Sequence, residues 1–314
     1  TALSGDELTV AISDGVVTVG GAAVQAADVA ASNGVVHVVG SVLTGGLDLV
    51  ERARVTPDLS TLVAAVVEAE LGETLGGEGP FTVFAPVNAA FAALDPDALG
   101  RLLADENRAL LRKVLTYHVV PGRVLSTDLV DDAEVGTVEG SPLRIDLDGG
   151  ATVNGVDIVA TDIEVENGVI HLIDGVLLQH LDVVDVAILN GFDALVGAVR
   201  AAGLEPALRD PTASLTVFAP TDAAFDAIGP VPTDPGTLTP ILTYHVVGSE
   251  AYAADLSDGQ VLTTLQSGTL TVLIDGGTVT LDGARNTAEV AATDVPASNG
   301  VIHVIDTVLL PPAD

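Results

Sequence analysis

The chain has 314 residues, of which 48% are hydrophobic and only 3% aromatic, and its 44 acidic against 11 basic residues give a formal net charge of −33. This charge excludes nucleic acid as a partner, because phosphate binding draws on clustered lysine and arginine, and the only lysine is Lys113. The absence of cysteine excludes a disulfide framework and thiol chemistry. The acidic residues are scattered, which predicts a solvated coat suited to a saline environment.

One pentad, Asn-Gly-Val-(Val/Ile)-His, occurs three times, at residues 33–37, 167–171 and 299–303. The spacing of roughly 130 residues is typical of a domain and too long for a solenoid repeat. Two other motifs that precede the pentad occur only twice. The copy numbers therefore predict a chain that opens partway through a repeat.

This mismatch divides the chain into three parts. We expect the carboxyl-terminal part of a domain at residues 1–46 and whole domains at 47–180 and 181–314. A domain of roughly 130 residues can bury a core of its own.

The first part alternates like β-strands. Residues 8–43 form apolar, alternating runs with a turn at Asp14-Gly15 and a second turn at the pentad. This pattern predicts strands without covering helices. Such a sheet cannot bury both faces, and its edges stay open to pairing. We therefore expect residues 1–46 to need a partner.

Each whole domain is predicted to open with helices and close with strands. Apolar residues recur at helical spacing; they are Leu59, Leu62, Val63 and Val66 in one domain and Phe192, Leu195, Val196 and Val199 in the other. The strand Thr-Val-Phe-Ala-Pro follows, and Asn88 or Asp222 is expected as the N-cap of the next helix. A helix at residues 107–116 then leads to Tyr-His-Val-Val, and runs separated by Asp-Gly-Gly predict β-hairpins.

Three blocks follow one another in both whole domains: Thr-Val-Phe-Ala-Pro-(Val/Thr)-(Asn/Asp)-Ala-Ala-Phe, Leu-Thr-Tyr-His-Val-Val, and Asn-Gly-Val-Ile-His-(Leu/Val)-Ile-Asp-(Gly/Thr)-Val-Leu-Leu. In this order they closely resemble the fasciclin domain, and residues 1–46 resemble its closing part. The resemblance implies tandem α+β domains, each a β-sandwich-like wedge with packed helices. It also implies a non-catalytic protein that is secreted or displayed on a cell surface and mediates adhesion.

The resemblance places candidate binding residues at a Tyr-His pair, which animal members of the family use for receptor contact. The pair is Tyr117-His118 in one whole domain and Tyr244-His245 in the other. From chemistry alone, a Tyr-His pair between a helix and a strand also fits a core element with satisfied polar groups. Both interpretations stay open.

The histidines do not predict a metal site or a cofactor. A metal site would join His118 with His171 and His245 with His303, but the members of each pair are ~55 residues apart and lack short ligand spacing. We expect structural histidines instead, with no metal and no cofactor. No Gly-x-Ser-x-Gly elbow, phosphate loop or His-Glu-x-x-His motif occurs, so we expect no catalytic residues.

The first functional hypothesis is an adhesion protein whose domain surfaces bind protein or glycan partners outside a microbial cell. The second is a structural subunit in which residues 1–46 complete a domain with a neighbouring chain, which gives a homo-oligomer or filament. The third, a polysaccharide- or small-ligand-binding protein, is favoured least. No apolar run approaches the ~20 residues of a membrane span, so we expect none in this chain.

Overall fold

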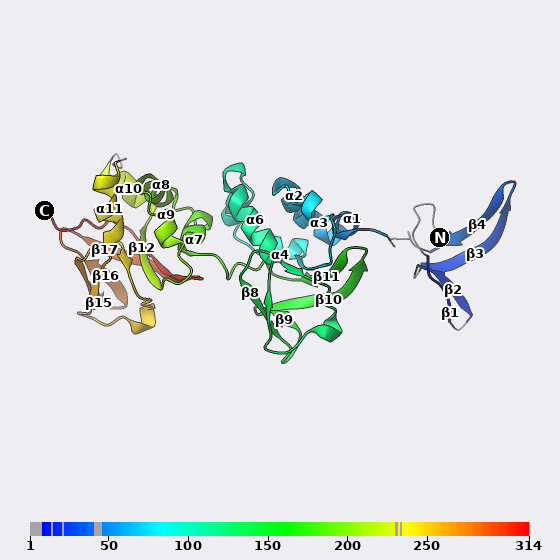
Figure 1. Cartoon of the computed structure of the whole chain (residues 1–314). Helices are drawn as coiled ribbons and strands as arrows, with labels where there is room; N and C mark the ends of the chain where they lie inside the picture. The colour runs from blue at the N-terminus through cyan, green and yellow to red at the C-terminus, as the bar shows by residue number, and fades with distance from the viewer. Residues whose placement is uncertain are drawn as a thin grey trace. The chain divides into compact units, whose positions relative to one another are not determined.

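The structure is a computed structural model that describes residues 8–13, 15–20, 22–40, 46–229, 232 and 234–313 (Figure 1).

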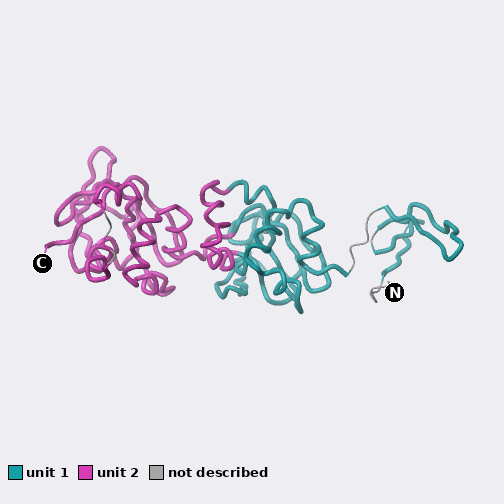
Figure 2. Tube along the Cα trace, turned by 90° about the horizontal axis from the view of Figure 1, so that it is seen from above, with its two compact units in different colours: residues 1–93, 115–176 teal, residues 94–114, 177–314 magenta. Residues whose placement is uncertain are grey.

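Two compact units make up the fold, as Figure 2 shows. The amino-terminal unit consists of residues 1–93 and 115–176, and the carboxyl-terminal unit of residues 94–114 and 177–314. Residues 94–114 therefore fold with the later part of the chain. The predicted division of the sequence at residues 46 and 180 stays a prediction.

Four antiparallel strands form the amino-terminal sheet, in the order β1-β2-β3-β4 (Figure 1). Their bounds are β1 Val10–Ser13, β2 Val16–Val19, β3 Ala22–Ala31 and β4 Gly34–Val39. The predicted strands are confirmed. Gly15 has a φ of 82°, as a tight turn requires, whereas Asp14 lies outside the described residues.

The first repeat, from α1 to β11, contains a seven-stranded sheet in the order β6-β5-β11-β10-β9-β8-β7. The strands are β5 Phe81–Pro86, β6 Val119–Pro121, β7 Glu134–Gly136, β8 Pro142–Asp146, β9 Thr152–Val153, β10 Val156–Val165 and β11 Gly168–Ile173. β11 runs parallel to β5, and β10 joins β11 to the β7–β9 side of the sheet.

The second repeat, from α7 to β18, has the same arrangement, with the order β13-β12-β18-β17-β16-β15-β14. The strands are β12 Leu215–Pro220, β13 Val246–Val247, β14 Val261–Thr263, β15 Thr269–Asp275, β16 Thr278–Asp282, β17 Thr287–Ala297 and β18 Gly300–Ile305. β18 is parallel to β12. The hairpin predicted from Asp-Gly-Gly joins β15 to β16, with positive φ at Gly276 and Gly277.

Helices precede and interrupt the strands of both repeats. The α-helices of the first are α1 Leu49–Arg54, α2 Ser60–Glu68, α3 Gly72–Leu75, α4 Asn88–Ala92, α5 Pro96–Leu102 and α6 Arg108–Tyr117; those of the second are α7 Val183–Leu189, α8 Asp193–Ala202, α9 Glu205–Leu208, α10 Asp222–Ile228 and α11 Pro235–Tyr244. Short 3₁₀ turns are η1 Pro57–Leu59, η2 Asp105–Asn107, η3 Ser126–Asp128 and η4 Ala253–Asp255. The predicted α+β fold is confirmed.

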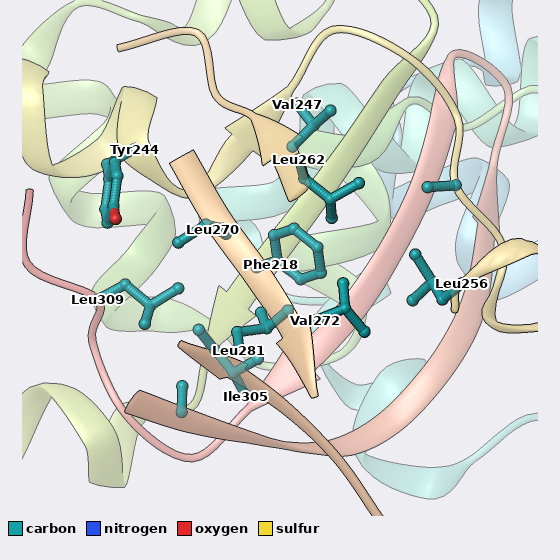
Figure 3. Close-up of a cluster of buried hydrophobic side chains, with 12 residues drawn as sticks. Phe218, Tyr244, Val247, Leu256, Leu262, Leu270, Val272, Leu281, Ile305 and Leu309 are labelled. Atoms are coloured by element: carbon teal, nitrogen blue, oxygen red, sulfur yellow. The ribbon is translucent and has the colours of Figure 1, made fainter. Parts of the chain in front are cut away.

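The core of the carboxyl-terminal unit is built mainly from aliphatic side chains around two aromatic rings, Phe218 and Tyr244 (Figure 3). Phe218 of β12 lies among Leu270, Val272, Leu281 and Ile305, all fully buried. β15 shows the predicted alternation, with Leu270 and Val272 buried between more exposed neighbours, whereas β12 is buried along its whole length.

Asn88 and Asp222 do not cap the helices that follow them, which corrects the prediction. Each is the first residue of its helix, α4 or α10. Its Oδ1 instead accepts a hydrogen bond at 2.9 Å from a first-turn amide of a neighbouring helix, Thr61 in α2 or Ala194 in α8. The sequence correctly indicated that these side chains accept a hydrogen bond from a first-turn amide. The amide belongs to a helix earlier in the chain, however, and not to the helix that follows.

The closing strand is buried in both whole repeats and exposed in the amino-terminal sheet. Val36 of β4 is 51% exposed, whereas its equivalents Ile170 and Ile302 are 2% and 0% exposed. In the whole repeats β5 and β12 lie beside β11 and β18, and apolar side chains of the first helices border the same cavities as Ile170 and Ile302. Among the described residues, β4 pairs only with β3.

The glycine of the pentad marks where the parallel strand approaches. A Cβ on Gly168 would lie 2.0 Å from the carbonyl oxygen of Phe81, and one on Gly300 would lie 2.1 Å from that of Leu215, but nothing lies within 4 Å of Gly34. The predicted turn before the glycine is confirmed. Neither Gly34 nor Gly168 has a positive φ, so at Gly168 glycine is needed for the close backbone approach and not for a left-handed turn conformation.

Substitution of the pentad glycine should have different effects where a parallel strand lies against it, at Gly168, and where none does, at Gly34. We expect Gly168→Ala to destabilise the first repeat by about 1–3 kcal/mol, because the added methyl group forces β5 away from β11. Gly34→Ala is expected to be neutral or stabilising by up to about 1 kcal/mol, since it meets open space. Hydrogen exchange of amides in β11 and β4 measures both effects. Equal losses in the two variants would contradict this explanation.

Candidate functional site

The two tyrosines of the predicted binding pair end helices and lie inside the protein. Tyr244, the last residue of α11, is buried. Its hydroxyl donates to the carbonyl of Thr269 and accepts from the amide of Ala284, both at 2.8 Å. The tyrosine thereby fastens the end of the helix to the β15–β17 side of the sheet.

Tyr117 makes the equivalent contacts at the end of α6. Its hydroxyl donates to the carbonyl of Pro142 at 3.0 Å and accepts from Nδ2 of Asn154 at 2.7 Å. Burial raises the pKa of Tyr117, which the hydrogen bond from Asn154 partly offsets. The same fastening therefore occurs in both repeats.

The histidines of the pair are buried as well. His245 donates from Nδ1 to the carbonyl of Ile241 at 2.8 Å and accepts at Nε2 from the amide of Leu309 at 2.9 Å. Both ring nitrogens are thus used in the neutral state. Burial lowers the pKa of His245 to about 4, although its bond to Ile241 acts in the opposite direction. His118 is buried at the equivalent place.

Apolar cavities adjoin these histidines. One of about 100 Å³ is bordered by His245, and one of about 40 Å³ by His118. Pockets that hold drug-sized ligands measure roughly 300–1,000 Å³, so neither cavity supports small-ligand binding. As placed, Tyr117, His118, Tyr244 and His245 fasten structural elements together, and their role in partner contact stays a prediction.

The pentad histidines also bind backbone. His171 and His303 are fully buried, and their Nε2 atoms donate to the carbonyls of Val124 at 2.9 Å and Ala251 at 2.8 Å. Their rings stack on the phenylalanines of β5 and β12, with centroids 5.4 and 5.6 Å apart. These are the structural roles that the sequence predicted.

His37, the third pentad histidine, is exposed. Its Nδ1 accepts from the amide of Asp28 at 3.2 Å, as Nδ1 of His303 accepts from the amide of Asp294 at 3.3 Å. Both aspartates have a φ near +59°, at 58° and 59°. The amino-terminal sheet therefore keeps the local geometry of a closing strand without its covering strand.

A buried ion cluster lies in the carboxyl-terminal unit. Lys113 Nζ lies 3.1 Å from Asp182 Oδ2 and 2.6 Å from Asp185 Oδ2. Arg209 Nη1 lies 2.9 Å from Asp182 Oδ2 and 2.5 Å from Asp185 Oδ1. Two carboxylates thus share two cations, which compensates the cost of burying them.

The pKa values in this cluster follow from burial and charge. Burial raises the pKa of Asp182, but the amide of Asp185 and the charges of Arg209 and Lys113 outweigh it and lower the pKa overall. Burial and then the charge of Asp182 raise the pKa of Asp185. Burial lowers the pKa of Lys113, but its contacts with Asp185 and Asp182 outweigh burial and raise it.

Sequence analysis missed this cluster. Its members come from α6, from the start of α7 and from the residue after α9. The usable signal was the single lysine of a very acidic chain. Its partners could not be chosen from the sequence, because 44 acidic residues are available.

Within the described ranges, no group of three or more His, Asp or Glu side chains is placed to hold a metal ion. No helix in this part of the chain is long and apolar enough to cross a membrane.

Comparisons with known proteins agree with the motif blocks. A family model for the fasciclin domain matches residues 1–45, 57–179 and 190–311. Periostin of Homo sapiens is 32% identical over 305 residues, which cover 95% of this chain and 35% of periostin. The protein sll1483 of Synechocystis sp. is 47% identical over 133 residues, which cover 42% of this chain and 73% of that protein.

The solved structures include a FAS1 domain pair from the insect cell adhesion molecule fasciclin I, with 20% identity and a TM-score of 0.38. That match covers 81% of this chain and 97% of the domain pair. On the strength of the family match, the chain belongs to the fasciclin family, and it is not an enzyme. It spans about a third of the length of periostin.

Removing one tyrosine hydroxyl tests its structural role. We expect Tyr244→Phe to destabilise the carboxyl-terminal unit by about 0.5–1.5 kcal/mol, because the buried hydroxyl that bonds to the carbonyl of Thr269 and the amide of Ala284 is lost. Tyr252→Phe is the matched control, since Tyr252 is 39% exposed, and we expect a change within about 0.5 kcal/mol. Guanidinium unfolding measures both; similar midpoints for the two variants would refute the role.

Acid is expected to weaken the carboxyl-terminal unit through His245. The folded pKa of about 4 lies below the ordinary 6.5, so this contribution to stability is complete above pH 6.5 and is lost as the pH falls toward 4. Over that window the loss amounts to about 3 kcal/mol. Titration of the His245 ring by NMR should give a midpoint near pH 4, and a midpoint near 6.5 would disprove the burial argument.

Proposed function

We propose that this chain is a non-catalytic adhesion protein that acts outside the cell or on its surface, where its fasciclin domains bind proteins or glycans. Membership of the fasciclin family supports the proposal, since adhesion is what the resemblance of the motif blocks implies. The net charge of −33 supports a saline setting, because salt shortens the range of repulsion from ~10 Å at 0.1 M to ~3 Å at 1 M.

The observation that carries the proposal is the uncovered sheet β1–β4. Val10, Ile12, Val35 and Val36 are all more than half exposed. These residues lie on the two edge strands, β1 and β4. On β4, Val36 is paired with Val29 of β3, which is 48% exposed, and adjoining exposed apolar side chains of this kind mark interaction sites. An open strand edge is also a template for pairing. This sheet is therefore the surface on which we expect a partner to bind.

The residues of β4 indicate what kind of strand fits beside it. Gly34 leaves room for a backbone as close as that of Phe81 beside Gly168. His37 keeps the ring that donates to a backbone carbonyl in both whole repeats. A parallel strand of the β5 kind fits Gly34 and offers a phenylalanine ring for His37 to stack on. The carbonyl acceptor for His37 would come from the segment that follows the β6-like strand, where Val124 and Ala251 lie in the whole repeats.

A second candidate is a structural subunit in which residues 1–46 associate with a neighbouring chain and build a homo-oligomer or filament. The same exposed valines favour it, because the apolar faces of two copies can pack together once salt screens their charge. A heterologous contact of this kind can propagate.

Self-association and adhesion are tested together with the purified chain. At about 1 M salt, where charge repulsion is short-ranged, light scattering should give a mass above the 31.6 kDa of one chain. Beads coated with the chain should cluster under the same conditions. The double variant Val35→Asp, Val36→Asp should remain monomeric and leave the beads dispersed, because charge at these positions opposes apolar packing.

The matched control is Val67→Asp, which adds a charge at a position of α2 that is 59% exposed and should associate like the unmodified chain. A chain that stays at the mass of one copy at both low and high salt contradicts self-association. Clustering that survives the double variant places adhesion on a surface other than β4.

A further inference from the structure

The ion cluster of the carboxyl-terminal unit has an acidic counterpart at the start of α1, where the described residues that border the site include no lysine or arginine. Asp48 caps α1 as Asp182 caps α7, each accepting from an amide of the first turn. Glu51 follows Asp48 by three residues, as Asp185 follows Asp182. The two pairs of acidic side chains therefore occupy the same places at the starts of equivalent helices.

The pentad asparagines make equivalent hydrogen bonds in the two repeats, which shows that the backbone around the two acidic pairs corresponds. Each ties the first amide of one helix to the carbonyls at the end of another. Asn167 bonds to Leu49 at 2.9 Å and to Leu75 and Gly77 at 2.8 Å each; Asn299 bonds to Val183 at 3.0 Å, Leu208 at 2.8 Å and Asp210 at 3.1 Å. This pairing of bonds aligns Gly76 with Arg209.

The two sites differ in what neutralises the acids. In the carboxyl-terminal unit, Lys113 and Arg209 contact both aspartates. Beside α1, an open hollow of about 730 Å³ is bordered by Asp48, Glu51, Gly76–Gly77, Glu78, Gly79, Pro80, Glu166 and Asn167. We call it the α1 hollow. Of the residues described around it, none is a lysine or arginine.

Lys113 shows how such a site is filled. It lies on α6, in the sequence between β5 and β6 of the first repeat, yet it contacts the first helix of the second repeat, α7. The opening part of one repeat thus delivers an ammonium group to the start of the next repeat.

The same delivery agrees with the spacing of the chain before the α1 hollow. His171 precedes Asp182 by the same number of residues as His37 precedes Asp48. The closing strands β11 and β4 are therefore followed by spacers of equal length before the acidic pair. A fasciclin opening half seated on β4 would stand in the same chain relation to Asp48 as α6 does to Asp182.

We propose that the α1 hollow receives a lysine ammonium from the opening half of a fasciclin domain, a segment of the same kind as residues 47–141, whose β5-like strand pairs with β4. This inference rests on the proposed function, since it names the partner of the same uncovered sheet. The carboxylates of Asp48 and Glu51 hold the ammonium, as Asp182 and Asp185 hold Lys113. Glu78 and Glu166 add negative charge at the border of the hollow.

The test supplies that partner by lengthening the chain. A copy of residues 47–141 is joined ahead of residue 8, which completes the pattern of a third domain. The copy contains one lysine, the equivalent of Lys113, so the lengthened chain has two lysines. The amino terminus is acetylated, and a carbodiimide then links amines directly to carboxylates that touch them. Peptide mapping by mass spectrometry identifies the linked residues.

We expect the copied lysine to link to Asp48 or Glu51, and Lys113 to link to Asp182 or Asp185 as the internal control. The variant Asp48→Asn, Glu51→Gln should lose the first link and keep the second. Hydrogen exchange reports separately on the sheet, and the amides of β4 should become protected in the lengthened chain.

Two results would overturn the proposal in distinguishable ways. If β4 becomes protected and Lys113 links normally but the copied lysine links elsewhere or not at all, the α1 hollow is not the lysine's site, while pairing on β4 stands. If β4 stays unprotected, the strand pairing that underlies the proposed function fails together with the proposal.

Discussion

Parallel pairing between two strands far apart in the sequence is the contact on which each whole repeat depends. It joins β5 to β11 and β12 to β18 over six residue pairs each. Parallel strands require a long crossover connection, so the helices and hairpins between them fold as that connection. The pairing buries the closing strand and brings the pentad asparagine to the start of the first helix, where it organises the acidic pair.

The amino-terminal sheet shows the same closing strand without this contact. Gly34, His37 and the valines of β4 are the residue types that the pairing requires, yet they are exposed. In an acidic chain this apolar surface is the part that favours association, while the charge opposes it until salt screens the repulsion. Under the proposed function, partner binding and its salt dependence both follow from this one uncovered strand.

Much of the fold was predictable because its signals are local. Alternation, helical spacing and Asp-Gly-Gly turns indicated strands, helices and hairpins, and repeated blocks indicated equivalent domains. Contacts between distant segments were not predictable in the same way. The side chain of Asn88 accepts from Thr61 instead of its own helix, and Lys113 binds acids 69 and 72 residues away. The pentad glycine was correctly located, but the strand that makes it necessary is set by tertiary pairing.

The central claim is that, within the part of the chain that the structure describes, β4 has no parallel partner of the kind that β11 and β18 have. Hydrogen exchange in dilute, low-salt solution, where charge keeps the chains apart, tests it most directly. We predict slow exchange for amides throughout β11 and β18 and fast exchange for the β4 amides that face away from β3, because only the latter lack a strand to accept their hydrogen bonds. Protection of those β4 amides equal to that of β11 would contradict the account.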